Sequence, residues 1–139
     1  MKPRILIASL VFVQALLLVS AQGKTTLDGV YTEAQAKRGE AVFTNVCAGC
    51  HQPDLSGDGQ TPALTGKDFN MDWIDQSLGD LFERTRISMP ADKPGSLAPA
   101  DVADVIAFVL SKGTFPAGAA ELAPDLAALK AIKFVSPKP

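Results

Sequence analysis

The chain carries its only two cysteines and its only histidine within five consecutive residues, Cys47-Ala48-Gly49-Cys50-His51. A disulfide between these cysteines would close a very small loop and would therefore remove little entropy from the unfolded chain. A redox-active dithiol is a stronger alternative, but that chemistry is expected where a strand runs into a helix, and the residues before Cys47 have a helical pattern. Zinc sites have four ligands, so a carboxylate would have to complete a site built from two cysteines and one histidine.

The spacing Cys-x-x-Cys-His is the attachment motif of c-type haem, and this interpretation accounts for all three side chains. On a helical turn, the thiols of Cys47 and Cys50 project toward the two vinyl positions of the porphyrin edge, and His51 follows beneath the iron. We therefore predict one covalently attached haem c per chain, with His51 as a ligand of its iron.

The N-terminus has the layout of a secretory signal. A short basic start precedes an apolar run over residues 5–19, and Val19-Ser20-Ala21 is a small-residue cleavage site. An uncleaved membrane anchor is the alternative, but the run is shorter than the roughly 20 residues of a spanning helix, and Gln14 interrupts it. We predict that residues 1–21 are a signal peptide, that the protein is periplasmic, and that it has no stable membrane insertion once the signal is removed.

Charge and length limit the partners and the number of domains. The chain has 139 residues, which is enough for one domain. Its 13 basic residues, of which Lys2 and Arg4 lie in the predicted signal, are outnumbered by 15 acidic residues. No basic stripe is present, so we expect no nucleic-acid partner.

The second axial position of the iron has few candidates. His51 is the only histidine, so this position is open or is filled by methionine, lysine or a terminal amine. Met71 and Met89 are the methionines that remain after removal of the signal. Met89 precedes Pro90, which ends a helix and presents the methionine from a stiff loop. Because a thioether is a recognised haem ligand, we predict that Met89 binds the iron and that Met71 fills a gap in the core.

Helical periodicity predicts an all-α domain, because no stretch alternates as a strand would. Thr32 is a candidate N-cap for a helix over residues 33–46, and Pro99 is well placed at the first position of a helix that extends to Ser111. A third helical pattern runs from Trp73 to Ile87, with a break or kink near Gly79.

Long loops rich in glycine and proline, over residues 52–66 and 90–98, would count against a compact helical domain. A haem resolves this objection because the loops can pack around its large apolar ring. We place the domain at residues 22–115 and a C-terminal tail at residues 116–139. In this tail a short helix packed on the domain and a loose terminus are equal alternatives; the apolar residues of that helix would be Leu122, Leu126, Leu129 and Ile132.

From about Gly39 to Gly113 the chain resembles the class I cytochromes c, the small monohaem electron carriers of the bacterial periplasm and of mitochondria. The resemblance rests on Cys47-Ala48-Gly49-Cys50-His51, on Gly39 and Phe43 before it, and on the later helix that bears Phe108. It implies the cytochrome c fold, in which three to five short helices surround the haem and Gly39 and Phe43 cross Phe108.

The resemblance also implies roles for two later segments. Pro62-Ala63-Leu64 matches the family segment whose proline carbonyl accepts a hydrogen bond from the ligand histidine and whose leucine packs on the haem, although Thr61 replaces the usual glycine. Met89-Pro90 matches the context of the axial methionine. The expected iron ligands are thus His51 and Met89, and the expected cofactor-binding residues are Cys47, Cys50, His51, Pro62, Leu64 and Met89.

A narrower resemblance concerns Leu78-Gly79-Asp80-Leu81-Phe82, which leads to Met89-Pro90. It is similar to the cytochrome domains that accompany periplasmic quinoprotein dehydrogenases. The expected function is therefore one-electron transfer, not enzymatic catalysis, between redox proteins such as a dehydrogenase and a terminal oxidase. The alternative is a haem enzyme or gas-binding protein in which Met89 does not bind and the sixth position is open.

Overall fold

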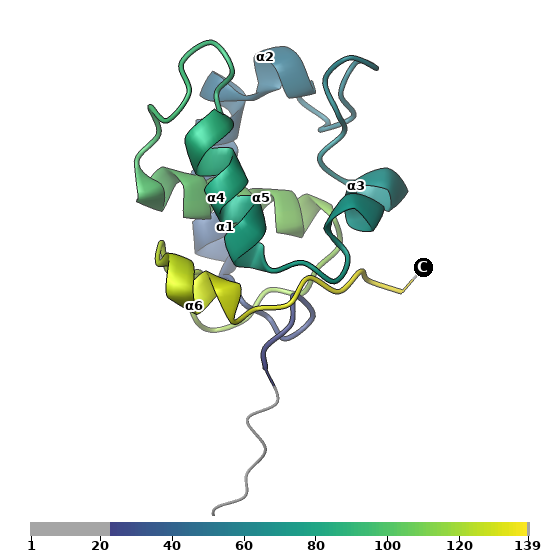
Figure 1. The fold of residues 1–139 in the computed structure, drawn as a ribbon, viewed down its shortest axis with the longest axis vertical. Coiled ribbons are helices and arrows are strands. Elements are labelled where there is room, and N and C mark those ends of the chain that lie inside the picture. Colours follow the sequence, from purple (N-terminus) through teal and green to yellow (C-terminus); the bar gives the residue numbers. More distant parts are fainter. Residues whose placement is uncertain (1–22, 139) are drawn as a thin grey trace, which may run out of the picture.

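The computed structural model describes residues 23–138, which fold into α-helices joined by loops (Figure 1). The described residues contain no β-strand, which confirms the all-α prediction, and the six helices are one more than the expected range. None of these helices is long and apolar enough to cross a membrane. The predicted signal peptide lies outside the described residues. The helices are α1 (Glu33–Val46), α2 (Ala48–His51), α3 (Gly66–Trp73), α4 (Leu78–Ser88), α5 (Pro99–Lys112) and α6 (Leu126–Lys130).

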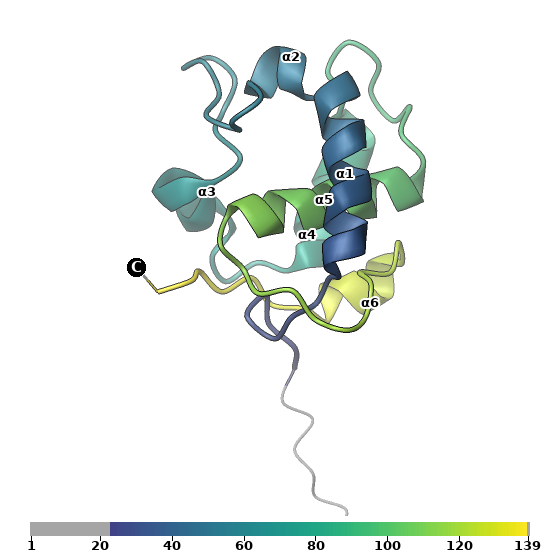
Figure 2. The ribbon, with the colours of Figure 1, turned by 180° about the vertical axis from the view of Figure 1, so that it is seen from behind.

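The crossing of α1 and α5 forms the centre of the fold (Figure 2). Gly39 of α1 lies directly against α5, since a Cβ atom at this position would lie 1.8 Å from the carbonyl oxygen of Asp104. Beside this contact the rings of Phe43 and Phe108 pack with their centroids 5.2 Å apart. The structure therefore confirms the contact among Gly39, Phe43 and Phe108 that the resemblance implied.

Local sequence signals explain where three helices begin. The side chain of Thr32 accepts a hydrogen bond from the backbone amide of Gln35 and caps α1, as predicted. Pro99 occupies the first turn of α5, also as predicted. Ser77 and Asp80 form a reciprocal capping box at the start of α4, in which each side chain accepts from the other residue's backbone amide.

The third predicted helix, from Trp73 to Ile87, corresponds to α4, which begins later, at Leu78. Residues 74–77 are not helical, and α3, which shares only Trp73 with the predicted pattern, was not expected. The expected break near Gly79 is wrong, because Gly79 lies inside α4, where its missing side chain allows the backbone of Lys130 to approach. The expectation that Met71 fills a gap in the core is also wrong. Its side chain projects from α3 and is 61% exposed.

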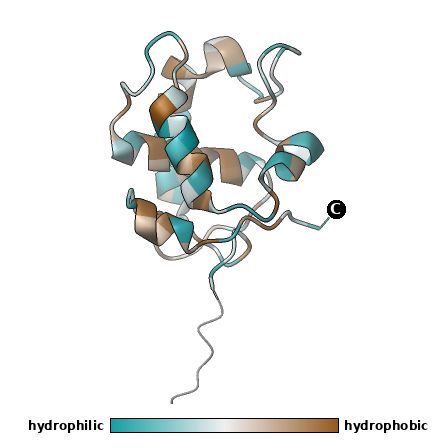
Figure 3. Cartoon of the chain, viewed as in Figure 1, coloured by the Kyte–Doolittle hydropathy of each residue, from teal (hydrophilic) through white to brown (hydrophobic). Residues whose placement is uncertain are grey.

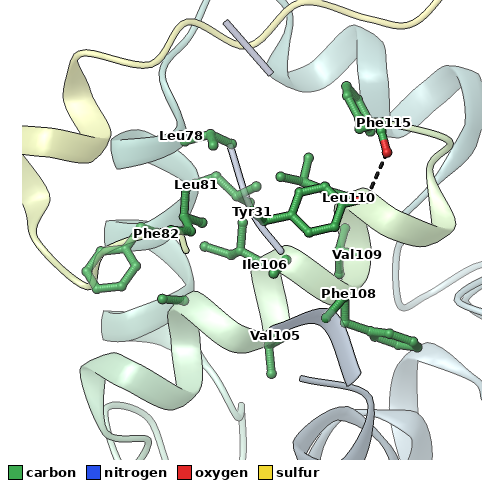
Figure 4. Packing of buried hydrophobic residues seen from close by; sticks show 14 of the residues in the cluster. Tyr31, Leu78, Leu81, Phe82, Val105, Ile106, Phe108, Val109, Leu110 and Phe115 are labelled. Atoms are coloured by element: carbon green, nitrogen blue, oxygen red, sulfur yellow. Dashed lines mark hydrogen bonds between the residues drawn. The ribbon is translucent and has the colours of Figure 1, made fainter. Parts of the chain in front are cut away.

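The apolar face of α5 is buried against α4 and against the segment before α1 (Figure 4). Leu78 of α4 and Leu110 of α5 are both fully buried beside Tyr31, whose hydroxyl donates a hydrogen bond of 2.7 Å to the carbonyl of Phe115. Figure 3 shows apolar residues along α5 and hydrophilic residues on the outward face of α4. This pattern is the one expected for helices packed around one core.

The C-terminal segment returns to the domain, and α6 packs on α4 (Figure 1). Leu122, Leu129 and Phe134 are at most 2% exposed. The described part of the tail is thus packed on the domain, which was one of the two alternatives left open by its sequence.

Candidate haem-binding site

The three residues of the predicted attachment motif lie where α1 gives way to α2. Cys47 is both the C-cap of α1 and the N-cap of α2, and the four-residue helix α2 contains Cys50 and His51. The backbone amides of Cys50 and His51 donate to the carbonyl of Cys47 at 3.1 and 2.9 Å. A single tight turn therefore holds both thiols and the imidazole.

The two cysteines are free thiols in different surroundings. Cys47 packs against the core, and its burial raises the pKa of its thiol, which therefore stays neutral at pH 7. Cys50 is exposed. A zinc site is not supported, because no group of three or more His, Cys, Asp or Glu side chains in residues 23–138 is arranged to hold a metal ion.

His51 is 7% exposed, and its Nδ1 atom lies 2.9 Å from the carbonyl oxygen of Pro62. A carbonyl oxygen can only accept a hydrogen bond, so Nδ1 carries the hydrogen and Nε2 keeps its lone pair. This tautomer is the one that can bind iron through Nε2. The donor set of two thiols and one oriented imidazole therefore fits a covalent haem c.

The loop over residues 52–65 fixes the position of the Pro62 carbonyl. The backbone amide of Gly57 donates to the carbonyl of His51 at 3.0 Å, which closes the start of the loop. Gly57 has a φ of 67°, and a Cβ atom on it would lie 2.2 Å from the carbonyl oxygen of Thr61. The chain on both sides of the His51–Pro62 hydrogen bond is thus held together at Gly57.

Asp58 organises the other side of the same turn. Its carboxylate accepts hydrogen bonds from the backbone amides of Gln60 and Thr61, at 3.0 and 2.7 Å. These hydrogen bonds hold the pKa of Asp58 below its usual value. Sequence reasoning did not assign this role to Gly57 or Asp58. Their order, a glycine followed by an aspartate before Pro62, was the available signal, because both residue types favour turns.

Met89 lies at the C-terminal end of α4. Its backbone amide donates to the carbonyl of Thr85 at 2.9 Å, and its φ and ψ of −117° and 152° are extended, as expected before proline. The helix therefore ends before Pro90, as predicted. Figures 1 and 2 show the loop that follows α4 at the same end of the molecule as α2 and the 52–65 loop.

The remaining predicted residue, Leu64, is partly buried and packs against the core. Its backbone amide donates to the carbonyl of Leu55 at 2.9 Å. The structure thus brings Pro62 to His51 and anchors Leu64 in the same loop.

Comparison with protein families now identifies the domain. The model of the family described as cytochrome c oxidase, cbb3-type, subunit III matches residues 34–109. The chain belongs to this family. It is a class I monohaem cytochrome c, an electron carrier and not an enzyme, and its Cys47–Cys50 pair is that of a covalently bound haem c. No curated protein and no solved structure matches the chain. The matched region extends from the first turn of α1 into the last turn of α5, so the segments that precede and follow it lie outside the family match.

Proposed function

We propose that the protein is a periplasmic one-electron carrier in which His51 and Met89 bind the haem iron from opposite sides. The observation that carries this proposal is the 2.9 Å hydrogen bond from His51 Nδ1 to the Pro62 carbonyl, because it leaves Nε2 free to bind iron. When bound, the haem supplies a one-electron Fe(II)/Fe(III) couple.

The chain's own residues hold this group and close its axial positions. Cys47 and Cys50 would form the two thioether links, and Leu64 would pack on the ring. Pro62 fixes the orientation of His51, which strengthens the imidazole as a ligand. Met89 supplies a thioether, which favours the ferrous state and raises the reduction potential. With His51 and Met89 both bound, no position would remain at which a substrate could bind the iron.

The proposed partners are other redox proteins. The resemblance of Leu78-Gly79-Asp80-Leu81-Phe82 to quinoprotein-associated cytochromes supports a quinoprotein dehydrogenase as the electron donor. The name of the matched family supports a terminal oxidase as the acceptor. Export through residues 1–21, which would be removed as a signal peptide, is supported by their basic start, apolar run and small-residue cleavage site. The exported chain would consist of the domain, residues 22–115, and the tail, residues 116–139.

The ligand proposal is tested with Met89→Ala, using Met71→Ala as the matched control. The unsubstituted holoprotein should show a low-spin c-type spectrum that carbon monoxide leaves unchanged, and its ferric form should show the charge-transfer band of a thioether–Fe(III) bond. Met89→Ala should lose this band, bind carbon monoxide and have a lower midpoint potential. Met71→Ala should match the unsubstituted protein, because Met71 is exposed on α3.

Two results would overturn the proposal. If carbon monoxide shifts the Soret band of the unsubstituted protein, the sixth position is open, and gas binding or catalysis becomes the better account. If Met89→Ala retains the thioether band, another residue is the ligand.

A further inference from the structure

Residues 126–135 form a strap, which comprises α6 and the extended segment after it, and which lies wholly outside the family match. The extended segment runs between the N-terminal segment of the domain and the connection from α3 to α4. Lys133 forms isolated bridges to both, with Thr25 on one side and Ser77 on the other. The strap therefore joins two parts of the chain that are distant in sequence.

Backbone hydrogen bonds hold both edges of the strap. On one edge, Thr26 donates to the Lys133 carbonyl at 3.0 Å, and Lys133 donates to the Lys24 carbonyl at 2.9 Å. On the other edge, Phe134 donates to the Gln76 carbonyl at 2.8 Å, and an amide of α4, that of Leu78, donates to the Ile132 carbonyl at 2.9 Å. The α3–α4 connection is thus fixed by the strap and not by its own residues alone.

Phe134 anchors the strap in the core. Its side chain is fully buried, and its ring packs edge-on against Phe69 of α3 and Phe115, at centroid distances of 6.0 and 5.3 Å. Aromatic pairs in this geometry add to the stabilisation that burial provides. Phe134 therefore connects α3 with Phe115, which lies just after α5.

The helix of the strap clamps the first turn of α4. A Cβ atom on Gly79 would lie 2.7 Å from the backbone nitrogen of Lys130, so the two helices touch at the backbone. The ammonium group of Lys130 pairs with Asp80 and lies 3.8 Å from Glu83. Since Met89 is the C-cap of α4, the strap holds the opposite end of the helix that presents the proposed ligand.

The His51 side of the site has no such attachment. In residues 23–138, no hydrogen bond or ion pair of the strap involves α2 or the 52–65 loop, which are held by the contacts of α1 and by the bonds around Gly57. A loss of the strap should therefore act directly on α4 and Met89, and it can reach the 52–65 loop only through α3, which follows that loop.

We propose that the strap positions the axial methionine: by fixing α3 and the start of α4, Phe134 and Lys130 keep Met89 on the iron. This inference rests on the proposed ligation by His51 and Met89. Phe134 and Lys130 are positioning residues, because they act through α4 and do not touch the cofactor. The strap, which lies outside the family match, would then set the affinity of this carrier for external ligands such as carbon monoxide.

The test compares Phe134→Ala with Leu122→Ala in the full-length holoprotein. Leu122 is also a buried apolar residue of the tail, but its backbone is held by Gln35 of α1, at 2.7 and 2.9 Å. Both substitutions should lower the midpoint of denaturant unfolding. Only Phe134→Ala should weaken the thioether–Fe(III) band and lower the reduction potential. It alone should also raise the apparent affinity for carbon monoxide about tenfold, which corresponds to about 1.4 kcal/mol lost from the methionine-bound state.

Two further variants keep the test decisive. Phe134→Leu retains an apolar anchor and should restore most of the band. Lys130→Gln removes only an exposed ion pair, so it folds even if Phe134→Ala does not, and it should raise carbon monoxide binding in the same direction by a smaller factor.

The outcomes separate this inference from the proposed function. If the unsubstituted protein already lacks the band and binds carbon monoxide, then Met89 is not the ligand and the proposed function fails. If the unsubstituted protein has the band, but neither Phe134→Ala nor Lys130→Gln changes it more than Leu122→Ala does, the proposed function stands and the positioning role of the strap is wrong.

Discussion

At the scale of single residues, the candidate site depends on Gly57 as much as on the side chains that would touch the haem. Gly57 combines a φ of 67° with a close approach to the backbone of Thr61, one residue before Pro62. A left-handed conformation alone can be adopted by other residues at a cost, as Gln52 and Leu55 of the same loop do. The close backbone contact cannot be relieved in that way, because the neighbouring atoms are not the end of a flexible side chain.

Replacing Gly57 with alanine should therefore disturb the orientation of His51. We expect Gly57→Ala to lose about 1–3 kcal/mol of unfolding free energy, the usual cost of a strained backbone conformation. It should also lower the reduction potential, because the Pro62 carbonyl would move away from Nδ1. Denaturant unfolding and redox titration measure the two effects. Gly59→Ala is the control, since Gly59 also has positive φ but has open space around its Cβ position. Equal effects of both substitutions on the potential would show that Gly57 does not act through Pro62.

At the scale of helices, the approach of α1 to α5 at Gly39 decides the stability of the fold. An alanine would favour the helix by about 1 kcal/mol relative to glycine. Its Cβ atom would however lie 1.8 Å from the carbonyl oxygen of Asp104, so the two helices would have to separate. Overpacking of this kind costs about 1–3 kcal/mol, and here it would also loosen the packing of Phe43 on Phe108. We expect Gly39→Ala to lose about 2 kcal/mol in denaturant unfolding. Gly49→Ala, with no atom within 4 Å of its Cβ position, should lose nothing; a stabilised Gly39→Ala would contradict this account.

The elements that sequence could predict are those whose signals are local. Thr32 and Pro99 mark the starts of α1 and α5, and the Cys-x-x-Cys-His motif predicts the compact turn that contains His51. The helix α3 and the start of α4 at Leu78 differ from the prediction. The capping box of Ser77 and Asp80 was a local signal for this start, but the connection is also held by a distant segment, since the strap bonds to Gln76 and Leu78. The break predicted near Gly79 is wrong because the role of this glycine depends on a residue distant in sequence: its missing side chain lets the backbone of Lys130 approach α4.

At the scale of the whole molecule, the segment before α1 and the segment after α5, which both lie outside the family match, pack against each other. A Cβ atom on Gly118 would lie 1.9 Å from the carbonyl oxygen of Gly29, and the amide of Gly118 donates to the carbonyl of Tyr31 at 2.7 Å. Arg38 of α1 joins this region by pairing with both Asp104 and Glu121, at 2.9 Å from each carboxylate. The segment before α1 is therefore held by the chain that follows α5, and the strap in turn bonds to this segment at Lys24 and Thr26.

The ion pair between the strap and α4 should make the unfolding free energy of the whole molecule depend on pH. The ammonium group of Lys130 and the hydroxyl and amide of Ser77 lower the pKa of Asp80 from 3.8 to about 2 in the folded protein. A carboxylate with a lowered folded pKa stabilises the fold above its unfolded pKa, and this contribution is lost as the pH falls from about 4 toward 2. Both partners are more than a third exposed, so solvent screening keeps the contribution small.

We therefore expect unfolding free energies of the unsubstituted protein and of Asp80→Asn to differ at pH 7 and to converge between pH 4 and pH 2. High salt should reduce the difference at pH 7, because the pair is exposed to solvent. Glu40→Gln removes an exposed carboxylate of α1 that takes part in no ion pair of the described residues, and it should produce no such convergence. Carbon monoxide binding gives a second readout: the bound fraction should rise as the pH falls from 4 to 2 in the unsubstituted protein, and it should already be raised at pH 7 in Asp80→Asn. This result would show that the ion pair between Asp80 of α4 and Lys130 of α6 stabilises the bound methionine as well as the fold. A pH-independent difference between the two proteins would mean instead that the lowered pKa of Asp80 does not contribute to the stability of the fold.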